Sequence, residues 1–269
     1  SAPLLGLVGI ANLSTGRFGQ AKAAFAKLAQ LKPNDADAYN NLGIALNELG
    51  EHDDAIANYQ RALALQPNYP GALNNMGNAL RALGRRDEAA QCYQRALKIT
   101  PNYPEALSNL GNALRDKGRL DEAVAAYERA LTIRPAYVDA LNNLAATFVA
   151  LRRRDNAIAC YTRILAINPN HARARIERLR QQAHICDWDG MKADAAAITE
   201  LGVSGEPVSP FAMLPLEDNP ARHRIRSERF ARKKYPHTPM PPRPRLASRP
   251  KRLRIGYFSA DFHDHATMH

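Results

Sequence analysis

The sequence predicts an all-helical solenoid over most of its length, followed by a proline-rich connection and the first strand of an α/β domain. Three observations lead to this prediction. Five prolines recur every 34 residues without an insertion, and glycine and aromatic columns recur in the same phase. A cluster of prolines then separates this region from a short β-rich run near residue 255. The recurring prolines are Pro33, Pro67, Pro101, Pro135 and Pro169.

Each repeating unit predicts a pair of antiparallel helices. Leu73, Met76 and Leu80 fall at i, i+3 and i+7, the apolar stripe of a first helix, and Tyr93 lies on the corresponding stripe of a second. Gly77 is small enough to let the two helices approach closely. One such pair cannot bury both of its apolar faces, so we expect neighbouring units to stack into an α-solenoid.

The pattern resembles the tetratricopeptide repeat (TPR), because several columns agree over five units. We therefore expect a TPR solenoid, or superhelix, over residues 1–171, with about five repeats of which the first is partial. Residues 172–235 are predicted to form capping and transition helices, the last of them running from Pro220 to about Tyr235. Trp188, the single tryptophan, is expected to be a buried anchor where the solenoid ends.

One asparagine column is the candidate peptide-binding site. The inner surface of a solenoid is made by its first helices, and we expect this column to lie there. An amide offers both donors and an acceptor, so a row of amides can hold the backbone of an extended peptide. The alternative that remains open is that each amide only bonds the neighbouring helix. The column consists of Asn41, Asn75, Asn109 and Asn143.

The formal charge of +11 is concentrated in one segment. Residues 221–254 hold 13 of the 37 Lys and Arg residues but only one acidic residue, Glu228, so the rest of the chain is almost neutral. Only two aromatic residues in that segment could stack on bases, so we interpret it as a solvated connection and do not expect nucleic acid as a partner.

No apolar stretch reaches the ~20 residues of a membrane span. Three cysteines without disulfide or metal spacing indicate a reduced, cytoplasmic protein.

The last part of the chain predicts a change of fold. Six prolines mark residues 236–250 as an extended basic linker, and residues 251–269 begin with a short β-rich run that is typical of a first strand in an α/β domain. Three histidines follow it, His263, His265 and His269. Histidines at this spacing could bind a metal ion, but the chain offers no further ligands to complete a metal site, so we expect no metal.

This order of elements resembles the O-linked N-acetylglucosamine transferases and their bacterial relatives. The resemblance rests on the TPR array, on Cys186-Asp187-Trp188, on the proline-rich linker, and on the run from Arg254 to Phe262 with His265 after it. It implies a glycosyltransferase with two Rossmann-like lobes (GT-B type) that moves N-acetylglucosamine from UDP-GlcNAc to Ser/Thr hydroxyls of proteins. It implies no metal cofactor, and it makes the TPR surface the binding site for protein acceptors.

The same resemblance makes His265 the candidate base or active-site organiser, with His263 and His269 as weaker candidates. Ala266 stands where many relatives have proline. The donor-binding lobe is not contained in residues 1–269, so its residues are unknown and we expect this segment to be inactive without a downstream catalytic domain. Two alternatives remain: a non-catalytic TPR scaffold that binds proteins, and a nucleic-acid binder that uses the basic segment.

Overall fold

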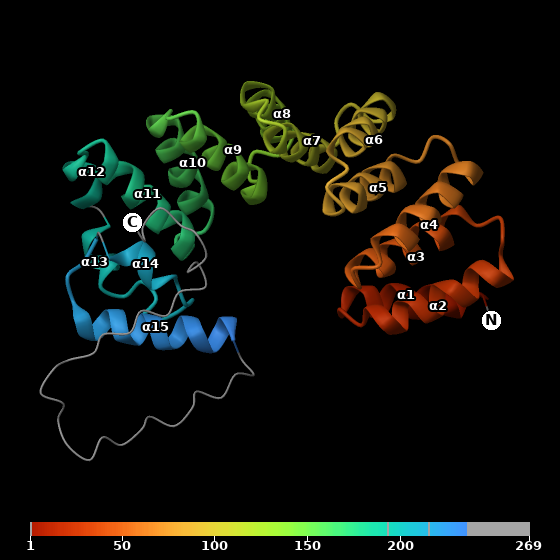
Figure 1. Ribbon diagram of the computed structural model, residues 1–269, viewed down its shortest axis with the longest axis horizontal. Helices are drawn as coiled ribbons and strands as arrows, with labels where there is room; N and C mark the ends of the chain where they lie inside the picture. Colours follow the sequence, from red (N-terminus) through yellow and green to blue (C-terminus); the bar gives the residue numbers. More distant parts are fainter. Residues whose placement is uncertain (1, 193, 215, 236–269) are drawn as a thin grey trace, which may run out of the picture. The chain divides into compact units, whose positions relative to one another are not determined.

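The computed structural model describes residues 2–192, 194–214 and 216–235. Two compact units divide the chain, residues 1–230 and 231–269, and the account below concerns the first. Its first part is a row of five helix pairs (Figure 1). The pairs are α1 (Ala2–Ser14) with α2 (Phe18–Leu31), α3 (Ala36–Glu48) with α4 (His52–Leu65), α5 (Pro70–Ala82) with α6 (Arg86–Ile99), α7 (Pro104–Asp116) with α8 (Leu120–Ile133), and α9 (Val138–Ala150) with α10 (Arg154–Ile167).

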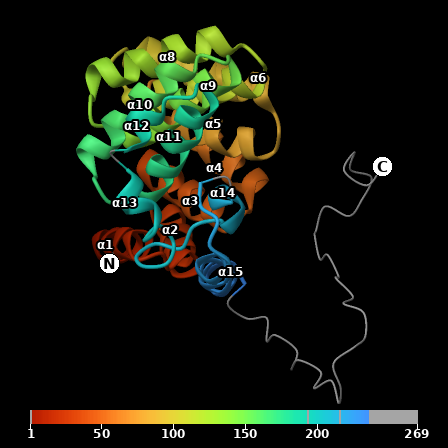
Figure 2. The same ribbon diagram turned by 90° about the vertical axis from the view of Figure 1, so that its left-hand side faces the viewer.

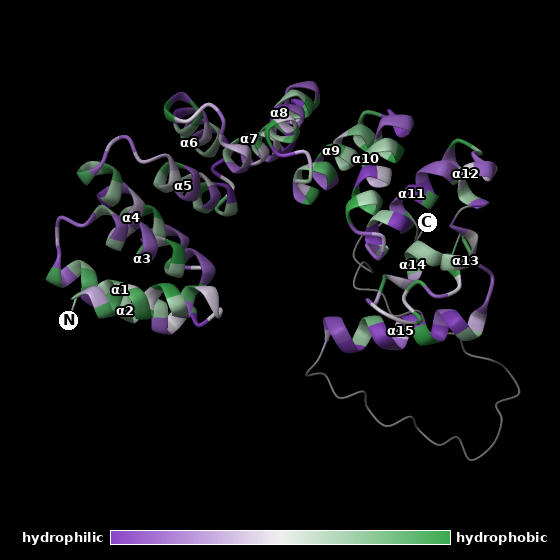
Figure 3. Ribbon diagram, turned by 180° about the vertical axis from the view of Figure 1, so that it is seen from behind, coloured by the Kyte–Doolittle hydropathy of each residue, from purple (hydrophilic) through white to green (hydrophobic). Residues whose placement is uncertain are grey.

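The predicted helix pairs are confirmed, and the first unit is larger than expected. We expected only part of a unit there, but α1 has 13 residues and α2 has 14, the same lengths as α3 and α4. α1 contains no charged residue and exposes Leu4, Leu7 and Ile10, which makes the first unit the most apolar one (Figure 3).

A ring stacked on a glycine sets the distance between the two helices of a unit. The buried ring of Tyr93 on α6 lies so close to Gly77 on α5 that an ideal Cβ there would be 2.5 Å from the ring. Gly43 and Gly111 have the same relation to Tyr59 and Tyr127. At these three glycines a Cβ would overlap the ring unless the helices or the ring shifted, because packed interiors have little free space; the fifth unit has Ala145 in this column.

Neighbouring units contact one another mainly through the second helix of one unit and the first helix of the next. α2 packs on α3, α4 on α5, α6 on α7 and α8 on α9, and successive odd-numbered helices also contact each other. Among the described residues, no contact of similar extent joins successive even-numbered helices. The odd-numbered helices are therefore closer together, and we call the surface that α3, α5, α7 and α9 share the inner face.

The fifth pair is followed by a set of capping helices. These are α11 (Ala172–His184), α12 (Trp188–Lys192), α13 (Ala195–Ile198), α14 (Pro210–Met213) and α15 (Pro220–Lys234). α11 packs on α10 as the next first helix would, and α15 begins at Pro220 as predicted. Asn219 caps α15, because its Oδ1 accepts a hydrogen bond from the backbone N–H of Arg222 at 3.1 Å.

One buried arginine holds the capping helices together. Arg226 on α15 is fully buried and donates to the carbonyls of Ile198 and Leu201, and to the Glu217 carboxylate at 2.7 Å. Figures 1 and 2 both show α15 beside α13 and α14. A buried guanidinium is tolerated only where its donors are satisfied, and here one side chain joins three segments.

The prediction that Trp188 is buried was wrong. Its side chain is 60% exposed at the start of α12, two residues after Cys186, a non-glycine residue with a positive φ of 58°. The anchor of the capping helices is instead Arg226, together with the apolar cluster around Ile176 and Met213.

The cysteines contain no disulfide within the described residues, since Cys92, Cys160 and Cys186 are all free thiols. Burial raises the pKa of the Cys160 thiol to about 11, so this group is protonated at neutral pH.

None of the helices described has both the length and the apolar character that crossing a lipid bilayer requires. The predicted linker, first strand and histidines lie outside the described residues.

Replacing Gly77 with Ala tests the ring-on-glycine contact. The new methyl group would overlap the Tyr93 ring, so we expect the free energy of unfolding to fall by about 1–3 kcal/mol, measured by chemical denaturation. The control is Gly19→Ala on α2, where a Cβ meets nothing within 4 Å. Equal stability of the two variants would contradict the proposed role of the contact.

Replacing Arg226 with Met tests the capping helices. The change leaves two carbonyls and part of the Glu217 carboxylate unpaired, and we expect a loss of about 3 kcal/mol from this region. Hydrogen exchange should rise in residues 198–230 while that of α3 to α8 stays unchanged. Arg224→Met is the control, because Arg224 is exposed on the same helix. Unchanged exchange in residues 198–230 would show that Arg226 is dispensable.

Candidate functional site

The predicted peptide-binding asparagines lie in one row on the inner face. Asn41, Asn75, Asn109 and Asn143 occupy the same turn of α3, α5, α7 and α9, and each is half-buried. Directly behind them lies a second, buried row, formed by Asn40, Asn74 and Ser108. The outer row is therefore within reach of a ligand, whereas the inner row is not.

Hydrogen bonds join the two rows across neighbouring units. Asn75 Nδ2 donates to Asn40 Oδ1 at 3.1 Å, and Asn109 Nδ2 donates to Asn74 Oδ1 at 2.9 Å. The inter-helix role that the sequence left open is thus present at two positions. Each of these outer amides keeps one N–H and its carbonyl oxygen without a further hydrogen bond among the described residues, so the inter-helix bond leaves groups available for a peptide.

The outer row does not make the same contacts at both ends. Asn41 Oδ1 accepts a hydrogen bond from Asn40 in its own helix, at 3.4 Å. Asn143 faces Ser108 rather than an asparagine, and its Oδ1 accepts instead from Arg115 Nη1 at 3.3 Å. The structure therefore brings Asn75 and Asn109 into one continuous amide network, and it places Asn143 beside a positive charge.

Charged residues flank the amide rows along the inner face. Asp37 lies at the start of α3, where its carboxylate accepts a hydrogen bond from Tyr69 Oη at 2.7 Å. Arg81 and Arg115 lie in the last turns of α5 and α7, and Arg81 Nη1 reaches the Asp116 carboxylate at 3.5 Å. This arginine position was missed in the sequence. In the sequence it is the position directly before Ala82 and Asp116, where the second unit has Asn47 and the fifth has Val149.

Buried tyrosines support the floor of the inner face. Tyr93 Oη donates to Asn78 Oδ1 and Tyr127 Oη donates to Asn112 Oδ1, both at 2.8 Å. Burial raises the pKa of Tyr127 to about 12, so its hydroxyl is a donor at neutral pH. These bonds hold the side chains of Asn78 and Asn112 in place on α5 and α7.

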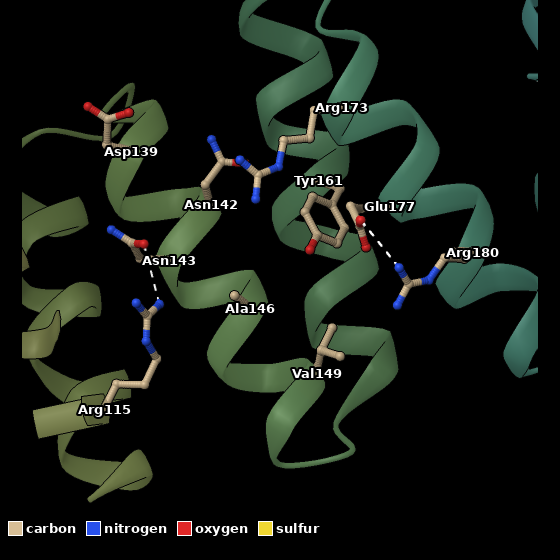
Figure 4. A pocket seen from close by; sticks show the side chains of 10 residues that line it. All are labelled: Arg115, Asp139, Asn142, Asn143, Ala146, Val149, Tyr161, Arg173, Glu177 and Arg180. Carbon is tan, nitrogen blue, oxygen red and sulfur yellow. Dashed lines mark hydrogen bonds and ion pairs between the residues drawn. The ribbon is translucent and has the colours of Figure 1, made fainter. Parts of the chain in front are cut away.

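The inner face ends in a hollow of ≈ 770 Å³ between α7, α9, α10 and α11. Figure 4 shows Arg115 and Asn143 on one side of it, Tyr161 and Arg173 on the other, and Ala146 in its floor. The side chains that line it are polar or charged in their majority. It is therefore suited to a polar ligand rather than to an apolar one.

The remaining site predictions are not tested by these residues. His263, His265 and His269 lie outside the described residues. Within the described part of the chain, no three His, Cys, Asp or Glu side chains are grouped as metal ligands would be. The absence of a metal and of a cofactor stays a prediction.

Three family models match the chain, and each describes a tetratricopeptide repeat. They cover residues 34–102, 74–138 and 114–183, which together form one continuous stretch. None of the curated proteins compared with the chain matches it.

Solved structures similar to the chain share its fold. PilF of Pseudomonas aeruginosa is 22% identical, with a TM-score of 0.65 over 76% of this chain and 93% of PilF. PilW, a type IV pilus biogenesis factor, is 18% identical, with a TM-score of 0.68 over 76% of this chain and 95% of PilW. MamA is 24% identical, with a TM-score of 0.54 over 62% of this chain and 97% of MamA.

Proposed function

Because residues 34–183 belong to the tetratricopeptide-repeat family, we propose that the chain is a protein-binding scaffold whose inner face holds an extended polypeptide. The observation that carries this proposal is the half-exposed amide row of Asn75 and Asn109, fixed in place by the buried amides behind it. A row that is held rigidly loses little side-chain entropy when it binds.

The chemistry of the row favours the peptide backbone as the ligand. The amides of Asn75 and Asn109 each have one N–H and one carbonyl oxygen without a hydrogen bond in the described residues, the complement of a peptide group. An extended strand presents such groups along its whole length, whatever its side chains. Recognition by this row would therefore depend on an unfolded, accessible segment more than on a particular sequence.

The test is binding of 15-residue peptides of degenerate sequence to wild-type protein and to Asn75→Ala/Asn109→Ala. We expect the variant to bind all peptides about tenfold or more weakly, since two hydrogen bonds of about 1 kcal/mol each are lost. Fluorescence anisotropy measures the dissociation constants.

The matched control is Asn40→Ala/Asn74→Ala. It removes the same two inter-helix hydrogen bonds from their acceptor side but leaves the outer amides on the surface. We expect this control to lower the melting temperature and to retain binding. Equal losses of binding in the two double variants would mean that the asparagines act only by holding the units together.

We propose as a second function that the bound polypeptides are acceptors of a glycosyltransferase. Support comes from the sequence alone: the proline-rich residues 236–250 precede a run from Arg254 to Phe262, with His265 after it, as in the O-linked N-acetylglucosamine transferases. In that case the inner face would raise the local concentration of acceptor segments near the catalytic domain. His265 would accept a proton from the acceptor hydroxyl or orient the sugar nucleotide.

Transfer of radiolabelled sugar from UDP-N-acetylglucosamine to protein tests this second function. We expect no transfer by residues 1–269 alone, and transfer when the sequence encoded beyond His269 is joined to them. In the joined protein His265→Ala should lower kcat sharply, whereas Asn75→Ala/Asn109→Ala should mainly raise KM for protein acceptors. Wild-type activity of His265→Ala would exclude the assigned role, and no transfer by the joined protein would leave the scaffold function.

A further inference from the structure

Next to the hollow at the end of the inner face, α9 carries smaller, apolar residues at three positions where α7 is polar or charged. Asn112, Arg115 and Asp116 on α7 correspond to Ala146, Val149 and Ala150 on α9, 34 residues later. Each change shortens a side chain and removes a hydrogen-bonding or charged group. Two of these smaller residues, Ala146 and Val149, line the hollow of ≈ 770 Å³.

The change from Asn112 to Ala146 leaves the Tyr161 hydroxyl without an acceptor. In the two preceding units the tyrosine donates to Asn78 or Asn112 at 2.8 Å, but Ala146 offers nothing to Tyr161. Tyr161 is 5% exposed, and its hydroxyl has no hydrogen bond among the described residues. Figure 4 shows this hydroxyl pointing into the hollow.

The change from Asp116 to Ala150 leaves Arg115 without a carboxylate partner. Arg81 reaches Asp116 on the next first helix, whereas the residue placed to receive Arg115 is Ala150. Arg115 contacts only the amide oxygen of Asn143, at 3.3 Å, and makes no ion pair within the described chain. A guanidinium has five N–H donors, so most of those of Arg115 remain available.

Arg173 of α11 supplies a second positive charge from the opposite side of the hollow. Its side chain is exposed, extends towards Asn142, and has no carboxylate partner in the described residues (Figure 4). Two acidic residues also line the hollow. Glu177 is already engaged by Arg180 at 3.5 Å, and Asp139 lies at the edge away from Tyr161. Positive charge therefore exceeds negative charge inside the hollow.

We propose that this hollow is a subsite for an acidic side chain of the bound polypeptide. The carboxylate would lie between Arg115 and Arg173 and accept a further hydrogen bond from the Tyr161 hydroxyl. Carboxylates are the usual partners of guanidinium groups, and bonds between charged groups are stronger than those between neutral ones. The inference rests on the proposed peptide-binding function, and it adds a side-chain preference to a face that otherwise recognises backbone.

The test compares three pools of 15-residue peptides, acetylated and amidated so that only side chains can supply a carboxylate. All positions are degenerate except a central triplet of Glu, Gln or Lys. We expect wild-type protein to bind the Glu pool about tenfold more tightly than the Gln pool, and the Lys pool most weakly. The preference should shrink as salt is raised.

Arg115→Gln/Arg173→Gln should abolish the preference, so that the variant binds the Glu and Gln pools with equal affinity. Tyr161→Phe, which keeps the ring, should reduce the preference by severalfold. The control is Arg95→Gln/Arg129→Gln, which makes the same charge change at exposed positions of α6 and α8. This control should keep the full preference.

The outcomes separate this inference from the proposed function. Equal binding of the Glu and Gln pools by wild-type protein, or an unchanged Glu preference in Arg115→Gln/Arg173→Gln, would overturn the acidic subsite while peptide binding stands. A uniform loss for all pools in Asn75→Ala/Asn109→Ala would support backbone recognition independently. Wild-type protein that binds none of the pools would overturn both.

Discussion

The contact of one aromatic ring with one glycine is the constraint on which the rest of the solenoid depends. Because Tyr93 fits directly against the backbone at Gly77, the two helices of the unit are close and their relative rotation is fixed. That rotation decides which residues of the first helix face outward. The amide rows are therefore usable as a binding surface only because the ring and the glycine hold each helix in its place.

The polar seam between units supports the solenoid, and the proposed recognition of a peptide would use the same side chains. A mid-helix asparagine is a poor helix former, and burial of its amide is costly unless its hydrogen bonds are made. The buried amides of Asn40 and Asn74 accept hydrogen bonds from Asn75 and Asn109, which offset the cost of burial. The same bonds hold the side chains of Asn75 and Asn109 in place. Of the two interpretations of the asparagine column that the sequence left open, the inter-helix bond is observed, and the proposed peptide contact would use the remaining groups of the same amides.

Periodicity made most of the fold predictable, and departures from periodicity were the part that was missed. The 34-residue columns gave helix pairs, their glycine contacts and the asparagine row, because each of these repeats in phase. Trp188 and Arg226 occur once, outside the period, and local pattern could not show that Arg226 is buried among carbonyls while Trp188 is exposed. The hollow was missed for the same reason. Ala146 offers no acceptor to Tyr161 and Ala150 offers no carboxylate to Arg115, which becomes visible only when the fifth unit is compared with the preceding ones in the structure.

The amide seam has one interruption, and it affects how the solenoid bends. Ser108 stands where the two preceding units have Asn40 and Asn74, so Asn143 has no asparagine partner on α7. Its hydrogen bond comes from Arg115, which is only half-buried. The apolar core runs on unbroken from α7 to α11. Bending between α7 and α9 would therefore break a solvated hydrogen bond where bending between α5 and α7 would break a bond to a buried amide, so the polar seam resists bending less at this junction.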